Sequence, residues 1–337
     1  LAGLLLPALS KALDSARSWL VPDPERNTLY ASRWDNGEYT VHKLGFAAAT
    51  NPATVGADWT ALAAPPGISG DGTDNGSAGM VAGGYLYAGA AFGGSSDQRK
   101  FCRLNTSSDT WQVSTKIGGE IAGGWAGVWG VIAQPTATGT WIFGQWCGTR
   151  FFQSYFVSNE EQFIYHAVGR ANDTPSYWGM DTVLGRDGVV YYYGQGVNGV
   201  SNALRRALVS ANVPSAICTP WVMAQGQPND NQNTRTGAAI VFIPAGRAPT
   251  YQDELWVMPA RVVQGGFPLP YSAIDRYRAS DGAYLASLPL PFSMANIGQG
   301  YDMAYLNGYL FVMEGGAAKK LWAYKLGDAE SIADARA

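Results

Sequence analysis

The sequence has little of what a metal centre or a thiol redox site needs. Its 337 residues contain three cysteines, Cys102, Cys147 and Cys218, and two histidines, His42 and His166. The cysteines are far apart and form no C-x-x-C pair, so no zinc knot or redox motif is present, while free thiols and one disulfide both stay open. Two histidines also leave little material for imidazole-bound metals or for a Ser-His-Asp nucleophile.

Charge and long apolar runs are scarce as well. Charged residues make up 15% of the chain, and 23 Lys and Arg stand against 26 Asp and Glu without a basic stripe, which argues against nucleic-acid binding. Residues 1–10 (LAGLLLPALS) are apolar but too short to span a membrane. We expect residues 1–16 to be an apolar tail or arm, either the remnant of a targeting segment or a segment that docks on a neighbouring protomer in an oligomer or assembly.

What the chain does have is glycine, aromatic residues and a repeat. The 42 Gly, 12 Trp, 18 Tyr and 12 Phe favour many short strands joined by tight turns. Similar aromatic strands recur every 51 to 64 residues, with markers at Tyr30, Tyr87, Trp141, Tyr192, Trp256 and Phe311. Six such units predict an all-β chain, a six-bladed β-propeller of four-stranded antiparallel blades. A β-sandwich or a pair of jelly rolls is the alternative, but neither requires equally spaced units.

The repeat sets the predicted domain organisation. Residues 17–337 form one propeller domain, with blades at approximately 17–66, 75–118, 122–172, 176–225, 235–291 and 298–337. The first strand of five units carries a glycine, as expected where strands crowd the axis: Gly79, Gly127, Gly179, Gly237 and Gly300. The corresponding stretch of the first unit, 16–21, has none.

Two units match a known pattern. Gly93-Gly94 followed by Asp109-Thr110-Trp111, and Gly315-Gly316 followed by Trp322, are similar to kelch-type propeller blades. The chain therefore resembles kelch-like β-propellers at the level of the fold. The histidines and the Cys-Tyr pair of copper oxidases of that fold are not matched, and the repeated Ser-x-Asp-x-Gly-x-Thr-Trp boxes of sialidase-like propellers do not occur.

Candidate ligand-binding residues lie at or beside the first strands, because propeller sites usually face the central channel. They are Asp74, Trp125, Tyr177, Trp178, Asp181, Arg235, Gln299, Tyr301 and Asp302. Asp181 and Asp302 hold similar places after Gly179 and Gly300, so they either share a proton or a cation or accept backbone N–H bonds. Tryptophan and tyrosine side chains stack on sugars or simply pack the blades. No cofactor is expected, apart from a weak Ca²⁺ signal near Asp71 and Asp74.

These features predict function only coarsely. With no recognisable catalytic set, we expect a non-catalytic interaction or structural propeller with protein or glycan partners. It would be extracellular or virion-associated, as an adhesin or as the nozzle or receptor-binding part of a phage tail. The alternative is a carbohydrate-active enzyme, a polysaccharide lyase or glycosidase, or a sugar-binding lectin, acting at the channel face.

Overall fold

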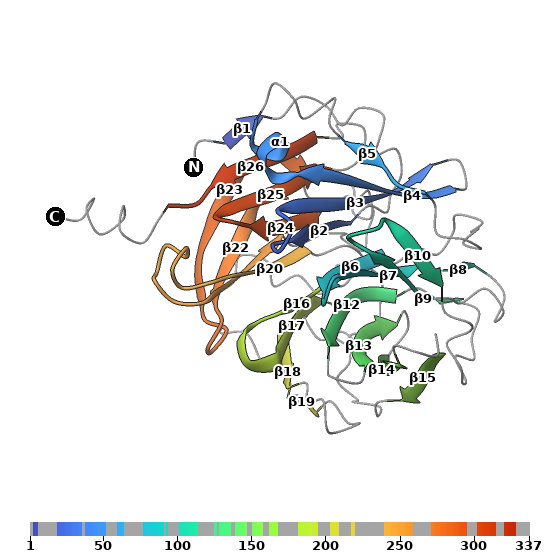
Figure 1. Cartoon of the computed structure of the whole chain (residues 1–337). Coiled ribbons are helices and arrows are strands. Elements are labelled where there is room, and N and C mark those ends of the chain that lie inside the picture. Colours follow the sequence, from blue (N-terminus) through green and yellow to red (C-terminus); the bar gives the residue numbers. More distant parts are fainter. Residues whose placement is uncertain are drawn as a thin grey trace.

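The computed structural model is built almost entirely from β-strands (Figure 1). It describes residues 3–5, 19–35, 38–51, 59–63, 77–90, 92–93, 101–113, 125–126, 128–135, 139–146, 150–157, 162–167, 181–194, 203–208, 217–219, 239–258, 271–294, 302–314 and 320–327. These residues form six four-stranded antiparallel sheets, one two-stranded ribbon, one short α-helix and one 3₁₀ turn.

The first three sheets follow one another along the chain. Sheet 1 contains β2 (Leu20–Asp23), β3 (Thr28–Asp35), β4 (Glu38–Gly45) and β5 (Thr60–Ala61), with α1 (Phe46–Thr50) after β4. Sheet 2 contains β6 (Ser77–Ala82), β7 (Tyr85–Ala90), β9 (Phe101–Asn105) and β10 (Thr110–Val113). Sheet 3 contains β12 (Val128–Pro135), β13 (Gly139–Trp146), β14 (Arg150–Val157) and β15 (Gln162–Ala167). The ribbon pairs β8 (Phe92–Gly93) with β11 (Trp125–Ala126).

The last three sheets repeat the order, with one exception. Sheet 4 contains β16 (Asp181–Leu184), β17 (Val189–Gly194), β18 (Ala203–Leu208) and β19 (Ile217–Thr219), with the turn η2 (Arg186–Gly188). Sheet 5 contains β20 (Ala239–Ile243), β21 (Glu254–Met258), β22 (Tyr271–Arg278) and β23 (Tyr284–Met294). Sheet 6 contains β24 (Asp302–Leu306), β25 (Tyr309–Glu314), β26 (Lys320–Lys325) and, from the other end of the chain, β1 (Gly3–Leu5).

The first strands of the six sheets, which we call the inner strands, are β2, β6, β12, β16, β20 and β24. Each inner strand contacts the inner strands of the two neighbouring sheets, and β24 contacts β2, so the series closes on itself. Figure 1 shows these strands near the middle of the molecule and the last strand of each sheet toward its outside. The predicted all-β propeller is therefore confirmed.

The hydrophobic core is divided into clusters that lie between neighbouring sheets. Leu29 of sheet 1 and Phe311 of sheet 6 belong to one cluster, and Trp256 of sheet 5 and Val312 of sheet 6 belong to another. Tyr191 of sheet 4 packs with Leu255 and Val257 of sheet 5 in the same way. Sheets 1 and 5 each contribute to two clusters, one with each neighbouring sheet, which explains why their strands are rich in apolar residues on both sides.

Most strands lie where the repeat predicts them. The six aromatic markers all fall in the second strand of a sheet, which confirms the alignment of the units. Of the predicted first-strand glycines, Gly79 lies in β6, and the other four lie outside the described residues. In sheet 1 the inner strand is Leu20–Asp23, so it begins later than the predicted 16–21. The outer strand of sheet 6 could come from either end of the chain on the sequence alone, and it is supplied by β1, whose Leu4 pairs with Ala323. Gly3–Leu5 therefore belongs to the propeller, whereas the sequence had placed residues 1–16 in a separate tail.

Candidate functional site

Asp181 begins the inner strand of sheet 4 and joins that strand to sheet 5. Its Oδ1 accepts a hydrogen bond from the backbone N–H of Thr182 at 2.8 Å. Its Oδ2 accepts one from the backbone N–H of Ile240 in β20 at 3.0 Å. One carboxyl group therefore satisfies a donor of its own strand and a donor of the next inner strand.

Asp302 does the same at the start of the inner strand of sheet 6. Its Oδ1 accepts a hydrogen bond from Met303 N–H at 2.7 Å, and its Oδ2 accepts one from Leu20 N–H of sheet 1 at 2.5 Å. The register of the two sheets shows that the aspartates are equivalent. In each sheet, an aromatic residue of the second strand, Tyr191 or Phe311, pairs with a residue of the first strand, and the aspartate lies two positions before that residue. The backbone N–H interpretation raised from the sequence is thus what the structure records at both positions.

The two carboxyl groups also act on each other. Both residues are half-buried, on inner strands that lie near the middle of the molecule (Figure 1). Burial raises the pKa of Asp181 to about 7, against the N–H bonds from Ile240 and Thr182 that lower it. Burial and then the charge of Asp181 raise the pKa of Asp302 well above its ordinary value. Both carboxyl groups are therefore protonated more readily than an ordinary aspartate.

Sheet 5 lies between these two sheets and carries a small residue at the equivalent position. That residue is Ala239, which pairs with Met258 and is 1% exposed. The methyl group of Ala239 cannot accept a hydrogen bond. The backbone N–H of Met303, on the next inner strand, donates to Asp302 instead. The small side chain between the two carboxyl groups is consistent with their mutual electrostatic effect.

The remaining predicted site residues are mostly outside the part of the chain that the structure describes. Trp125 lies in β11, where it pairs with Gly93. Asp74, Tyr177, Trp178, Arg235, Gln299 and Tyr301 lie outside the described residues, as does Asp71. His42 is in β4, the third strand of sheet 1, and His166 is in β15, the outer strand of sheet 3, as predicted. The structure therefore brings together two of the nine candidates, Asp181 and Asp302.

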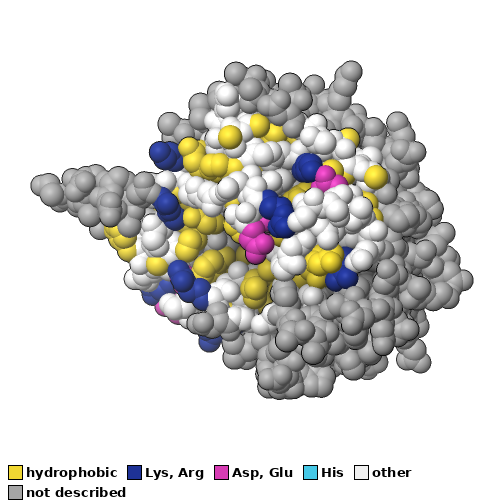
Figure 2. All heavy atoms as spheres, in the orientation of Figure 1, with side chains coloured by type: hydrophobic (Ala, Val, Ile, Leu, Met, Phe, Trp, Pro, Cys, Tyr) yellow, Lys and Arg dark blue, Asp and Glu magenta, His cyan; other side chains and the backbone are white. Residues whose placement is uncertain are grey.

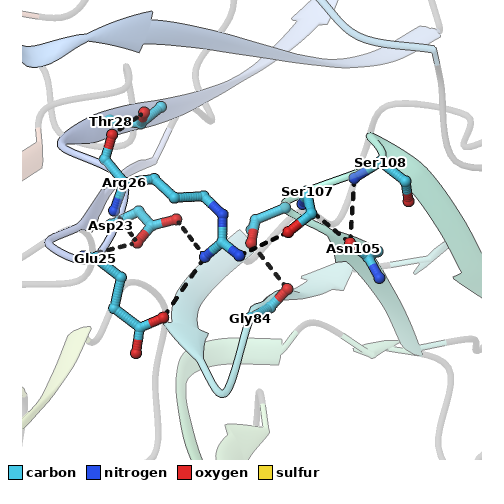
Figure 3. Close-up of polar contacts among 9 residues, drawn as sticks. Asp23, Glu25, Arg26, Thr28, Gly84, Asn105, Ser107 and Ser108 are labelled. Atoms are coloured by element: carbon cyan, nitrogen blue, oxygen red, sulfur yellow. Dashed lines mark hydrogen bonds and ion pairs between the residues drawn. The ribbon is translucent and has the colours of Figure 1, made fainter.

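Sequence reasoning missed a set of polar contacts at the turns between first and second strands. Arg26, in the β2–β3 turn, donates a hydrogen bond from Nη2 to Ser107 Oγ of sheet 2 at 2.7 Å (Figure 3). The same guanidinium lies 3.6 Å from carboxylate oxygens of Asp23 and of Glu25. In the matching turn of sheet 4, Arg186 donates to Asp253 of sheet 5 at 2.8 Å. An arginine in the same turn of units 1 and 4 was the available signal.

A second missed feature is the tyrosine on the second strand, which binds the following sheet. Tyr87 OH and Thr140 Oγ1 of sheet 3 are 2.9 Å apart, and Tyr191 OH donates to Ala279 O of sheet 5 at 3.2 Å. At the same position of sheet 1, burial and then the charges of Asp23 and Asp109 raise the pKa of Tyr30 to about 12, with Arg26 acting in the opposite sense. The phenols of Tyr87 and Tyr191 therefore join each second strand to the next sheet.

The described residues contain no cluster of three or more His, Cys, Asp or Glu side chains that could hold a metal ion. Within the same residues, no helix has both the length and the apolar character required to cross a membrane. On the face seen in Figure 2, Lys and Arg side chains are scattered, and some of them touch acidic ones.

Comparison with known proteins gives the class of fold. No protein-family model matches the sequence, and neither does any curated protein. Among solved structures, an α-L-arabinanase of Penicillium chrysogenum is similar with a TM-score of 0.60 and 12% identity, over 98% of this chain and 99% of that one. A Hadza microbial sialidase gives 0.58 and 14%, over 94% and 66%. A luciferin-regenerating enzyme gives 0.53 and 12%, over 96% and 95%.

These likenesses establish a β-propeller fold of the kind found in glycosidases. They contradict our expectation of a non-catalytic structural or interaction propeller, such as an adhesin or a phage-tail part, because the three solved structures are all enzymes. The arabinanase and the sialidase agree better with the alternative drawn from the sequence, a carbohydrate-active enzyme, than with that expectation. The physical reason for the error is that an apparent lack of catalytic motifs was taken as a lack of chemistry, whereas propeller sites are assembled from single residues of different sheets.

Proposed function

We propose that this chain is a carbohydrate-active enzyme, a glycosidase whose site lies where the inner strands begin. The observation that carries the proposal is the pair Asp181 and Asp302, two partly exposed carboxyl groups from sheets 4 and 6 that affect each other's ionisation. The arabinanase and the sialidase that share the fold are glycosidases, which supports the same class.

Glycoside hydrolysis commonly uses two carboxyl groups in different protonation states. One donates a proton to the departing oxygen, and the other, ionised, acts as base or nucleophile. Two carboxyl groups with raised pKa values, one of which bears on the ionisation of the other, suit such a division of roles. In this chain, the backbone amides of Thr182, Ile240, Met303 and Leu20 fix the two carboxyl groups in orientation, which is what a pre-organised acid and base require.

The finer expectations from the sequence stay predictions within this proposal. A glycan is the expected partner, and an extracellular location suits an enzyme that acts on polysaccharide. The resemblance of the second and sixth units to kelch blades also stays a prediction. Assembly through residues 1–16 and Ca²⁺ binding near Asp71 and Asp74 remain open to measurement of solution mass and of calcium affinity.

The test is hydrolysis of defined glycans. Purified chain is incubated with arabino-oligosaccharides, with sialylated oligosaccharides and with a panel of other polysaccharides, and reducing ends or released sugars are measured. Asp181→Asn and Asp302→Asn should each lower kcat by at least about 10²-fold, since each removes one member of the acid and base pair. Asp281→Asn alters an exposed turn carboxylate and should leave the rate unchanged.

Folding must be checked in parallel, because each Asn replaces one acceptor oxygen by an amide donor. Circular dichroism and a thermal transition for each variant separate loss of chemistry from loss of structure. Binding of glycans without turnover across the panel, or full activity in both Asn variants, would contradict the proposal. A product whose anomeric form is identified by NMR would then show which role the ionised carboxylate takes.

A further inference from the structure

We propose that Asn307 is a site of covalent modification, deamidation through cyclisation onto Gly308, which stays closed while sheets 6 and 1 are joined and becomes reactive when that junction opens. Two features support this: the conformation of the turn that holds Asn307 and the contact of its side chain with sheet 1. The reaction needs no substrate and is independent of any glycosidase activity.

Asparagine followed by glycine is especially open to this reaction, because glycine has no side chain to shield its backbone nitrogen. The nitrogen of Gly308 loses its proton and attacks Cγ of Asn307, the Cγ–Nδ2 bond breaks, and Nδ2 leaves with that proton as ammonia. Water then opens the five-membered ring at either carbonyl, which gives aspartate or isoaspartate. The sequence contains four Asn-Gly pairs: Asn36-Gly37, Asn75-Gly76, Asn198-Gly199 and Asn307-Gly308. The last of them lies within the described residues.

The conformation of the turn keeps the two reacting atoms apart. Asn307 and Gly308 connect β24 to β25 with φ values of 48° and 82°, the left-handed conformations that an Asn-Gly hairpin turn requires. Ring closure needs Cβ of Asn307 and the nitrogen of Gly308 to be nearly eclipsed, whereas in the left-handed conformation they point away from each other. Leu306 pairs with Tyr309, and Gly308 O accepts a hydrogen bond from Leu326 N–H at 2.8 Å, so this turn is fixed by its neighbours.

The side chain of Asn307 is held by the opposite end of the chain. Its Nδ2 donates a hydrogen bond to Oδ1 of Asn27, in the matching turn between β2 and β3. Asn27 also has a positive φ, 49°, and its backbone O accepts a hydrogen bond from Phe46 N–H at 2.6 Å, so the acceptor is itself fixed. The bond ties the leaving group to sheet 1 and keeps Cγ of Asn307 from turning toward Gly308.

Gly308 is covered from sheet 5. It is buried, and a Cβ built on it would lie 3.5 Å from Cζ and Nη1 of Arg247, in the turn between β20 and β21. Asn307 is exposed, so water reaches the ring product once the turn has opened. Isoaspartate adds one methylene to the backbone and no longer fits a two-residue hairpin turn. An opening of the ring of sheets at this junction is therefore recorded as a permanent chemical change.

Peptide mapping by mass spectrometry of the full chain measures the reaction directly. Wild-type protein is incubated in mildly alkaline buffer, once folded and once unfolded in guanidinium chloride, and the conversion of Asn307 is followed over time. We expect Asn307 to react at least about tenfold more slowly in the folded chain, because the reaction has to wait for a local opening. Equal rates in the folded and the unfolded chain would overturn the proposal.

A variant of Asn27 tests the contact between the two sheets. Asn27→Gly removes the acceptor and tolerates the positive φ, so the rate at Asn307 in the folded chain should rise by about fivefold, the effect of one lost hydrogen bond. The rate at Asn198, in unit 4, should not change. Ser107→Ala is the matched control, because it removes a turn-to-turn hydrogen bond with Arg26 at the junction of sheets 1 and 2 and should leave Asn307 at the wild-type rate.

A wild-type rate at Asn307 in Asn27→Gly, or an equal rise in Ser107→Ala, would overturn the proposal. Thermal unfolding of both variants shows whether they fold. The comparison of folded with unfolded wild-type protein decides even where a variant does not fold. Because no glycan is present, the outcome is separate from that of the hydrolysis test.

Discussion

Arg276 donates two hydrogen bonds to the carboxylate of Glu254, at 2.7 and 2.8 Å, from the third strand of sheet 5 to its second strand. Glu254 has no exposed surface, and it also accepts from Trp256 Nε1 at 2.8 Å and from Thr250. This ion pair is therefore fully satisfied inside the sheet, which is the condition under which a buried pair is tolerated.

Breaking that pair on one side should be costly. Arg276→Met leaves Glu254 as a buried unpaired charge, so we expect a loss of about 3 to 5 kcal/mol in the free energy of unfolding. The double substitution Glu254→Gln with Arg276→Met should recover a large part of the loss, because no charge remains to be desolvated. Urea unfolding of the two single variants and the double variant measures the coupling. Strictly additive losses would contradict the interpretation.

The pH dependence of stability should have two arms. Burial opposes ionisation of Glu254, but the hydrogen bonds from Arg276, Thr250 and Trp256 outweigh it and lower its pKa. Its contribution is present above its unfolded pKa, near 4.3, and is lost as pH falls through the lower folded value. The pair Asp181 and Asp302 acts in the opposite sense, so the urea midpoint should be highest in weak acid. Glu254→Gln should flatten only the acid arm.

A methyl group on Gly79 should destabilise the inner strand of sheet 2. A Cβ there would lie 2.9 Å from Val21 Cγ2 and 3.2 Å from Tyr87 O, so strand β2 or β7 would have to move. We expect Gly79→Ala to cost about 1 to 3 kcal/mol as an overpacked site. Gly246→Ala is the matched control, since a Cβ at Gly246 meets no atom within 4 Å. Thermal unfolding of the pair tests this, and similar transitions in the two variants would contradict the close approach of sheets 1 and 2.

Removing the hydroxyl of Tyr87 should weaken the contact between sheets 2 and 3. The hydroxyl lies 2.9 Å from Thr140 Oγ1, and both residues are buried. Tyr87→Phe leaves Thr140 without this partner, so we expect a loss of about 1 to 2 kcal/mol in urea unfolding. Tyr309→Phe provides the control. It removes the same hydroxyl group from a ring that packs on Phe46 and Phe311. A loss in the control as large as that in Tyr87→Phe would assign the effect to the aromatic change itself.

The sequence by itself determined the class of fold. The spacing of Tyr30, Tyr87 and Trp256 placed the second strands correctly, because period-two strands with an aromatic residue on a buried face leave a local signature. The turns at Gly83-Gly84 and Asn307-Gly308 could also be predicted from the sequence. Glycine and asparagine are the residues that adopt positive φ most easily, and all four do so in the structure. Equal spacing of such units then left the propeller as the favoured arrangement.

The tertiary structure alone decided which distant residues meet. Asp302 and Leu20 are at opposite ends of the chain, and nothing near either of them indicates a hydrogen bond between them. The outer strand β1, the mutual effect of Asp181 and Asp302, and the contact of Arg26 with Ser107 have the same origin. Local patterns specify strands and turns, whereas closure of the ring sets the pairs across sheets, and those pairs carry the candidate chemistry.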